Sequence, residues 1–348
     1  MANRFVETGR KCVFLVVVAL LLAACTGNGT QGDGLMSSSG RSSEVLVVCP
    51  DKDWNGSLGD SLREVLEAPV AGLPRTEPMF RVSQVNPEHF TPMYQKQRNI
   101  LVLQVRADAT ASRLLVERDK WARPQTVLSL SSPRADSLAV AFSCVQERIV
   151  QHIMQGEMRR FQRAQRAQED ASLNRRLQER YALSMVLPEG FFFAVCRPDF
   201  CWLRKETKYW GQSVMVYTEP YTSESQFSPE HIAALRNRLT HAYVQGSSEG
   251  SYASIDDRFY PVLYRNFAFP NSPYAVEARG LWGLFGHPGD HMGGAFVSYT
   301  FLDTVYQRVV TADAFLYAPS DEKRDLLRQE EAILLTLQAV DTLSAAKK

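Results

Sequence analysis

The chain has 348 residues, of which 45% are hydrophobic and 22% are charged, a composition typical of folded globular proteins that excludes bulk disorder. Its 39 Lys and Arg side chains are balanced by 38 Asp and Glu, giving a formal net charge of +1, so we do not expect nucleic acid as a partner. Its six cysteines are too few for a fold held together by disulfides.

The first residues have the pattern of a signal peptide. Arg4, Arg10 and Lys11 precede an apolar run over residues 12–22. At 1.5 Å per residue this run spans only about 17 Å, roughly half of a bilayer core, and is too short for a membrane-spanning helix. A basic start followed by a short apolar run indicates a segment that directs export and is then removed.

The end of this segment resembles the lipobox of bacterial lipoproteins. Residues 22–25 read LAAC, with two small residues before the cysteine. The resemblance implies that residues 1–24 are a signal peptide and that Cys25 becomes the lipidated first residue, carrying a diacylglycerol. The alternative is an ordinary secretory signal in which Cys25 is incidental. Besides this covalent lipid, we expect no cofactor.

A tether is expected to follow the lipidated cysteine, over residues 25–43. Twelve of the eighteen residues from 26 to 43 are Gly, Ser or Thr, and such a coil has a reach of about 23 Å. Cleavage removes three bases and one acid, which leaves a net charge near −1. No acidic cluster directly follows Cys25, so we expect anchoring in the outer membrane, facing the periplasm rather than the cell surface.

An N-terminal α/β lobe is predicted over residues 44–132. A β-branched run at residues 44–49 (EVLVVC) indicates a buried strand, and a helix follows at residues 58–67 with Ser57 as its N-cap. Further strands are predicted in the segments that remain, namely residues 80–85, 99–105 and 126–130. Alternating strands and helices favour an α/β arrangement.

A long connecting helix is predicted over residues 133–181. The segment from residue 134 contains no proline, and Gly156 is its only glycine. After Met158 it becomes rich in Arg, Gln and Glu. Because a run of mixed charge usually faces solvent, we interpret this part as the solvated face of a helix that joins two lobes. The alternative is a basic helix that binds a partner.

The C-terminal lobe, residues 182–348, is predicted to hold a twisted antiparallel sheet covered by helices. Ser228 and Pro229 open a helix that ends near Tyr243, and an amphipathic helix is expected at residues 321–343. The strands predicted between and before these helices are residues 184–187, 191–196, 201–206, 213–217, 260–269, 274–285, 295–303 and 308–317. The fold class is therefore α+β, with two α/β lobes joined by a long helix.

Several segments resemble one family of envelope lipoproteins, which is known as domain of unknown function 4837. They are residues 72–80 (GLPRTEPMF), 97–101 (QRNIL), 121–125 (WARPQ), 187–191 (LPEGF) and 317–334 (YAPSDEKRDLLRQEEAIL). The resemblance implies coverage of nearly the whole mature chain, and the family has no assigned activity or catalytic residues. The LPEGF strand start and the strand-rich second half are also loosely similar to the PsbP/Mog1-like α-β-α sandwich.

Cys196 and Cys201 are a candidate disulfide. They flank a four-residue loop that contains Pro198 and Asp199, and these two residues favour a turn. Cysteines that face each other across a hairpin lie near bonding distance, and the cell envelope permits oxidation. The alternative is that both act as small apolar residues, as we expect for the isolated Cys49 and Cys144.

The strongest candidate for a metal site is a glycine-rich turn at residues 286–294. It contains His287, Asp290 and His291, and these side chains are of the types that bind zinc or a similar ion. The alternative is a hairpin turn whose polar side chains face solvent. Asp51 and Asp53, which follow the first strand, are also more simply interpreted as parts of a turn.

An aromatic-rich stretch lies between residues 252 and 274. Half of an alternating strand faces outward, so these rings are candidates for a stacking surface that binds a sugar or a peptide. The alternative is that they pack the sheet against its helices. The members are Tyr252, Phe259, Tyr260, Tyr264, Phe267, Phe269 and Tyr274, joined by Trp282.

Together these features predict a membrane-anchored lipoprotein of the bacterial cell envelope. No complete catalytic set is present, so we expect a non-catalytic module that binds an envelope protein or a glycan. The expected membrane contact is through the lipid on Cys25. The alternative is a metal-dependent hydrolase that uses His287, Asp290 and His291 on cell-envelope or glycan material.

Overall fold

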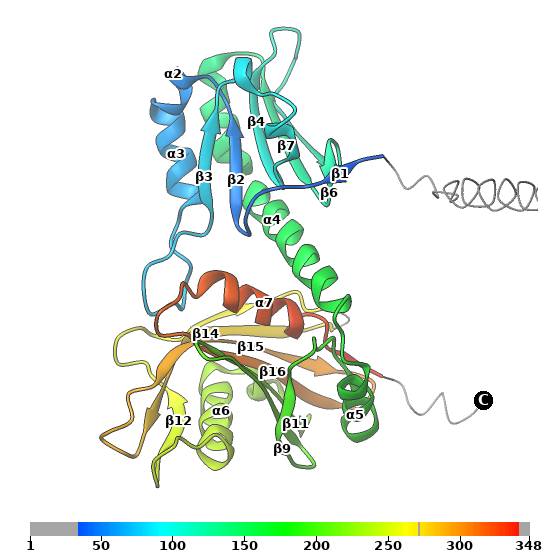
Figure 1. Cartoon of the computed structure of the whole chain (residues 1–348), viewed down its shortest axis with the longest axis vertical. Helices are drawn as coiled ribbons and strands as arrows, with labels where there is room; N and C mark the ends of the chain where they lie inside the picture. Colours follow the sequence, from blue (N-terminus) through cyan, green and yellow to red (C-terminus); the bar gives the residue numbers. More distant parts are fainter. Residues whose placement is uncertain (1–33, 271, 341–348) are drawn as a thin grey trace, which may run out of the picture. The chain divides into compact units, whose positions relative to one another are not determined.

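The structure is a computed structural model, and it describes residues 34–270 and 272–340 (Figure 1). The predicted signal peptide, the lipidation site Cys25 and the first part of the predicted tether lie outside these residues. Among the described helices, none combines the length and the apolar character needed to cross a bilayer. The described residues from Ser37 onward form one compact unit.

The N-terminal lobe is built on a five-stranded sheet in the order β3-β2-β4-β7-β5. Four strands are parallel, and β5 is an antiparallel edge strand. The predicted strands at residues 44–49, 80–85, 99–105 and 126–130 are all present, whereas β5 was not predicted. The bounds are β2 (Glu44–Val48), β3 (Arg81–Val85), β4 (Asn99–Val105), β5 (Arg113–Arg118) and β7 (Thr126–Ser132).

Two helices cover one face of this sheet (Figure 1). Leu62 of α3 (Ser57–Leu66) and Phe142 of α4 (Ala135–Arg166) are fully buried in the same core as Val45 and Leu101. The N-cap of α3 is Gly56 rather than the predicted Ser57, which becomes the first helical residue. The short elements of this lobe are β1 (Met36–Ser37), α2 (Asp51–Trp54), β6 (Ala122–Arg123) and two 3₁₀ turns, η1 (Pro87–His89) and η2 (Tyr94–Lys96).

The described end of the predicted tether is part of the folded body. The backbone N–H of Ser38 donates to the carbonyl of Arg123 at 3.0 Å, and Ser39 donates to Lys96 at 2.8 Å. Ser43 is fully buried. Residues 38–43 are therefore held by backbone hydrogen bonds despite their Gly- and Ser-rich composition.

The predicted helix over residues 133–181 is divided into two helices, α4 and α5 (Ala171–Tyr181). The side chain of Asp170 accepts hydrogen bonds from the backbone N–H groups of Ser172, at 2.9 Å, and Leu173, at 3.4 Å. Its own N–H donates to the carbonyl of Leu187 at 2.9 Å. The chain turns here without glycine or proline because Asp170 caps a new helix while its backbone bonds to the C-terminal lobe.

The C-terminal lobe contains an eight-stranded antiparallel sheet, in the order β12-β14-β15-β16-β11-β10-β9 with β13 beside β14. This confirms the α+β class with an antiparallel sheet covered by helices. The bounds are β9 (Phe192–Cys196), β10 (Phe200–Glu206), β11 (Gly211–Pro220), β12 (Tyr252–Ile255), β13 (Leu263–Asn266), β14 (Ala275–Phe285), β15 (Gly293–Asp303) and β16 (Arg308–Tyr317).

Helices pack on both faces of this sheet. Leu177 of α5 and Leu334 of α7 (Arg324–Leu334) share a core with Val297. On the other face, Ile232 of α6 (Pro229–Tyr243) packs in a second core with Phe296. Helix α6 starts as predicted, because the hydroxyl of Ser228 accepts the N–H of His231 at 3.2 Å. The remaining short 3₁₀ turn is η3 (Glu224–Phe227).

The closing helix is shorter than the predicted range of residues 321–343. It ends at Leu334, and the chain then forms β17 (Gln338–Ala339), which pairs with β8 (Leu183–Ser184). The start of α7 is fixed by the other lobe, because the carboxylate of Glu77 accepts the N–H groups of Lys323 and Arg324 at 2.8 and 2.9 Å. This carboxylate replaces an N-cap within the helix's own sequence.

Candidate functional site

An arginine-lined cavity of about 270 Å³ lies in the N-terminal lobe. It is formed by the end of β5, the loop that leads through β6 into β7, and one face of α4. We call it the arginine pocket. Its lining residues are Arg118, Asp119, Arg123, Pro124, Gln125, Thr126, Gly156, Arg159, Arg160 and Arg163.

Arg160 is the buried cation of the pocket, only 9% exposed. Its Nη2 atom donates to Oε1 of Glu157 at 2.8 Å and also to Oδ1 of Asn99. Its Nε atom is buried and has no hydrogen-bond partner within the described chain. A buried donor without a partner is costly, so this atom has an unused capacity to donate a hydrogen bond.

The surroundings of Arg160 hold it in one orientation. Asn99 donates from Nδ2 to the carbonyl of Glu44 at 2.8 Å and to Oε1 of Glu157 at 2.6 Å. Arg98 lies 3.6 Å from the other oxygen of Glu157, which is fully buried. Two cations thus share one carboxylate, so the network keeps a net positive charge beside the pocket.

Gly156 allows α4 to approach the start of β7. A Cβ atom at this position would clash with Oγ1 of Thr126 and would lie 3.4 Å from Nη2 of Arg160. Gly156, Arg159, Arg160 and Arg163 have the spacing i, i+3, i+4 and i+7, so they share one face of the helix. The glycine brings this face close to the sheet.

The loop that forms the opposite wall is held by Gln125. Its Oε1 atom accepts the N–H of Trp121 at 3.0 Å, and its Nε2 atom donates to the carbonyls of Gln95 and Gln97 at 2.6 and 2.7 Å. Its backbone N–H donates to Oδ1 of Asp119 at 2.7 Å. The WARPQ segment is therefore fixed before any ligand arrives.

The rim of the pocket is strongly positive. Arg118, Arg159 and Arg163 are exposed, and their side chains form no ion pair with any residue that the structure describes. Burial lowers the pKa of Arg159, and the nearby charges of Arg118 and Arg160 lower it further. Only one acid, Asp119, lines the cavity, and it lies 3.4 Å from Arg123.

The chemistry of this arrangement is anion recognition. Guanidinium groups present planar pairs of donors that match the oxygens of phosphate or carboxylate. The same repulsion between cations acts on His152, whose pKa is lowered by burial first and then by Arg148, Arg118 and Arg159. A bound anion would relieve this repulsion.

Sequence reasoning missed the arginine pocket, because it interpreted the Arg-rich part of α4 as a solvated face. That interpretation is wrong for Arg160, which is buried. The available signal was the helical spacing of Gly156, Arg159, Arg160 and Arg163, together with the WARPQ segment that contributes the facing loop.

Cys196 and Cys201 lie opposite each other, as predicted. They are register partners in the antiparallel pair of β9 and β10. Both are free thiols in the structure. Burial raises the pKa of Cys201 to about 12, and Cys196 adds to this effect. The hairpin is confirmed, and the disulfide stays a prediction. Cys49 and Cys144 are also free, and Cys144 is exposed.

The three candidate metal ligands do not gather into a cluster within the described residues, and the metal site stays a prediction. His287, Asp290 and His291 lie in the turn between β14 and β15, where Nδ1 of His287 accepts the N–H of Gly289 at 3.1 Å. Oδ1 of Asp290 instead accepts the hydroxyl of Ser248 at 2.9 Å. Nowhere in residues 34–270 or 272–340 do three His, Cys, Asp or Glu side chains gather so that they could hold a metal ion. The turn favours local hydrogen bonds over converging ligands.

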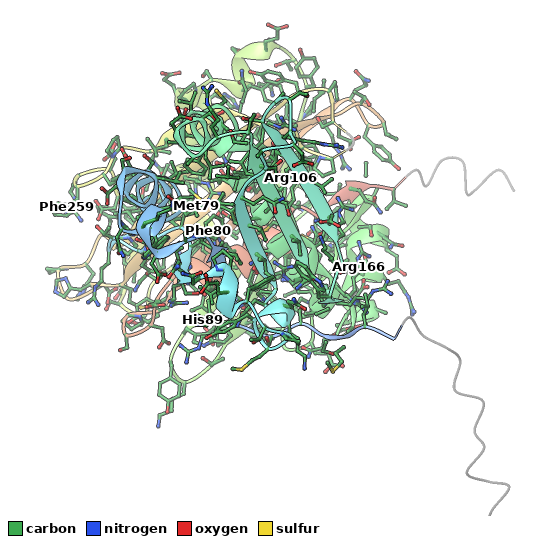
Figure 2. All side chains as sticks on the ribbon, turned by 90° about the horizontal axis from the view of Figure 1, so that it is seen from above. Met79, Phe80, His89, Arg106, Arg166 and Phe259 are labelled. Carbon is green, nitrogen blue, oxygen red and sulfur yellow. The ribbon has the colours of Figure 1, made fainter. Side chains whose placement is uncertain are left out.

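Part of the aromatic stretch packs in the two cores of the C-terminal lobe, Phe267 and Phe269 in one and Tyr264 and Trp282 in the other. Phe269 is buried and stacks on Phe301 with ring centroids 4.2 Å apart. Phe267 packs against Tyr299 with centroids 4.7 Å apart. Phe259, which is 82% exposed, lies at the outer edge of the molecule in Figure 2. Phe267 and Phe269 therefore pack the sheet, while Phe259 does not.

Comparisons with protein families divide the chain into two parts. Residues 170–336 match the model of a domain of unknown function (DUF4837), and residues 38–166 match that of another domain of unknown function (DUF8532). The first match confirms the resemblance predicted from the sequence. The segments at residues 72–80, 97–101 and 121–125 fall in the second model instead, as does the whole arginine pocket. Neither model assigns an activity.

No curated protein matches the chain. Among solved structures, the Saccharomyces cerevisiae Ran-binding protein Mog1p aligns with 11% identity over 47% of this chain and 92% of its own, with a TM-score of 0.29. A mutant of protein Mog1 aligns with 12% identity over 47% of this chain and 93% of its own, also with a TM-score of 0.29. A structural similarity this weak supports no conclusion about function.

Proposed function

We propose that this protein is a lipid-anchored module of the bacterial cell envelope that binds an anionic ligand in the arginine pocket. The single observation that carries the proposal is the buried Nε atom of Arg160, which has no partner among the described residues and belongs to a side chain that lines the cavity. A buried polar group of this kind is expected to be satisfied by a ligand or by water.

Binding, rather than catalysis, is supported by the residues around the cavity. The lining supplies cations and hydrogen-bond donors, and its one carboxylate, Asp119, already accepts the N–H of Gln125. A general base would need a free acceptor placed near a reacting group. The pocket therefore has the chemistry of a receptor for anions.

The membrane anchor is supported by the sequence alone. The basic start, the short apolar run and the LAAC segment agree on lipidation of Cys25, and two acyl chains are enough for stable attachment to a bilayer. The proposed location is the outer membrane, with the body facing the periplasm.

Titration with inorganic phosphate tests the pocket. The polypeptide that starts at Thr26 lacks the cysteine proposed to carry the lipid and contains every residue that the structure describes. We expect saturable binding that falls about tenfold when Arg159→Ala and Arg163→Ala are combined.

The matched control removes the same charge from another helix. Arg175 and Arg180 of α5 are exposed, and the double change Arg175→Ala and Arg180→Ala is expected to leave phosphate affinity within about twofold. Equal losses in both double variants would show that phosphate responds to net charge only. Absence of any saturable binding to the unaltered polypeptide would refute the proposed function.

Intact-mass analysis tests the anchor separately. Protein from native envelopes is expected to begin at Cys25 with the added mass of its acyl chains. The Cys25→Ala variant is expected to leave the membrane fraction. A mature protein that begins at another residue and carries no lipid would contradict the anchor.

A further inference from the structure

The chain enters the folded body at the rim of the arginine pocket. The N–H of Ser38 donates to the carbonyl of Arg123 at 3.0 Å, and its hydroxyl donates to the carbonyl of Pro124 at 2.8 Å. Arg123 and Pro124 both line the cavity. Ser38 is therefore bonded directly to the pocket wall.

The length of this segment limits how far the pocket lies from the anchored lipid. Ser38 follows Cys25 by thirteen positions in the sequence. Even a fully extended chain spans at most about 3.6 Å per residue, so the pocket wall stays within about 47 Å of the lipid whatever path the segment takes. Tethering over such a distance gives headgroups of the same bilayer an effective concentration in the millimolar range.

The charge of the pocket complements an anionic membrane, whereas the charge of the whole chain does not. The cleaved chain has a net charge near −1, so attraction to an anionic surface has to come from a local cluster. Five of the ten lining residues are arginines and one is an acid. Clusters of this kind bind anionic headgroups.

The size and the polarity of the cavity restrict which part of a lipid enters. A volume of about 270 Å³ is at the small end of ligand sites, and Pro124 is the only lining residue with a purely apolar side chain. A phosphate with its glycerol unit suits such a cavity, while acyl chains find no apolar surface there and stay in the bilayer.

We propose that the arginine pocket binds the phosphate of an anionic phospholipid headgroup from the bilayer in which Cys25 is anchored. The inference rests on the proposed function and adds the source of the anion. Arg160 contacts the phosphate from inside the pocket, and Arg118, Arg159 and Arg163 surround it at the rim. Bound in this way, the body is held against the membrane by a second contact besides its lipid.

Vesicle sedimentation of the polypeptide that starts at Thr26 tests this inference. Vesicles of phosphatidylcholine with phosphatidylglycerol are compared with vesicles of phosphatidylcholine alone. We expect recruitment only by phosphatidylglycerol, weakened about tenfold or more by Arg159→Ala with Arg163→Ala. The control pair Arg175→Ala with Arg180→Ala is expected to retain recruitment within about twofold.

The outcomes separate the two proposals. Equal recruitment of all three proteins would overturn the inference, because attraction would then not involve the pocket. Saturable binding of inorganic phosphate without recruitment to vesicles would overturn the membrane source and leave the proposed function standing. If the unaltered polypeptide binds neither inorganic phosphate nor the phosphatidylglycerol vesicles, both proposals are rejected.

Discussion

Two buried arginine–carboxylate pairs in this protein have similar chemistry but different access. Arg236 of α6 binds Asp313 of β16 through Nε at 2.8 Å and Nη2 at 3.3 Å, and its guanidinium lies 4.0 Å above the ring of Phe296. Arg160 binds Glu157 through one nitrogen and lines a cavity.

The difference shows how access decides the role of a buried cation. Arg236 is 1% exposed and Asp313 is fully buried, and burial raises the pKa of Asp313 although Arg236 opposes this rise. That pair links α6 to the sheet. Arg160 lines a cavity and has a buried Nε atom without a hydrogen-bond partner among the described residues, so the same kind of side chain is here a candidate binding group.

The largest expected effect is on the enclosed pair. Arg236→Ala leaves the carboxyl of Asp313 buried without its partner and is expected to lower the free energy of unfolding by about 3–5 kcal/mol. Denaturant titration measures this loss. Replacing both partners, by Arg236→Met with Asp313→Leu, is expected to recover most of it. A small loss in the single variant would mean that the pair is not isolated from water.

The hairpin of β9 and β10 offers the next largest effect. We expect Cys196 and Cys201 to be bonded in protein from an oxidising envelope, where the short loop between them limits the stabilisation to about 2 kcal/mol. The double change Cys196→Ser with Cys201→Ser is expected to cost about that amount without unfolding the protein. Peptide mapping without reduction checks the bond, and two alkylatable thiols would disprove it.

Glu330 of α7 is an enclosed carboxyl with no cation bound to it among the described residues. Its Oε1 atom accepts the N–H of Ser213 at 3.2 Å, and burial raises its pKa well above the usual value. The folded state therefore binds a proton more tightly than the unfolded state, and stability falls as pH rises from the unfolded pKa towards the folded one. Through this one group, the free energy of unfolding falls by at most about 1.4 kcal/mol per pH unit.

Glu330→Gln tests this pH dependence. The amide keeps an oxygen for the N–H of Ser213 but has no proton to lose, so the slope contributed by this residue is expected to vanish. Unfolding measured from pH 5 to pH 8 compares the two proteins. An unchanged slope would show that other groups determine the pH dependence.

The smallest expected change in stability is at the rim of the arginine pocket. Arg159→Ala with Arg163→Ala removes two exposed side chains and is expected to change the free energy of unfolding by less than about 0.5 kcal/mol, even though anion affinity falls about tenfold. Thermal unfolding without phosphate provides the measurement. A large destabilisation would mean that these arginines support the fold rather than a ligand.

The sequence predicted the elements whose signals are local. The apolar run of β4 and the Ser228–Pro229 start of α6 were both found, because propensity and capping act within a few residues. The edge strand β5, with the mixed sequence RLLVER, was missed because its partner β7 supplies the pairing. The end of α4 was missed because the chain there bonds to Leu187 of the other lobe.

The arginine pocket could not be assembled from the sequence, because its two walls are about 35 residues apart and meet only through the sheet. The spacing of Arg159, Arg160 and Arg163 shows a common helix face, but not that Gly156 brings this face against Thr126. The turn containing His287 and His291 shows the opposite. Its residue types suit a metal ion and lie close together in the sequence, but their side chains do not come together at one point.

Nuclear magnetic resonance of the arginine Nε–H groups tests the central claim most directly. In nitrogen-15-labelled polypeptide starting at Thr26, titration with inorganic phosphate is predicted to shift the resonance of Arg160 saturably and to leave that of Arg236, already bonded to Asp313, unchanged. An unmoved Arg160 resonance at saturating phosphate, or equal shifts at both arginines, would contradict the account.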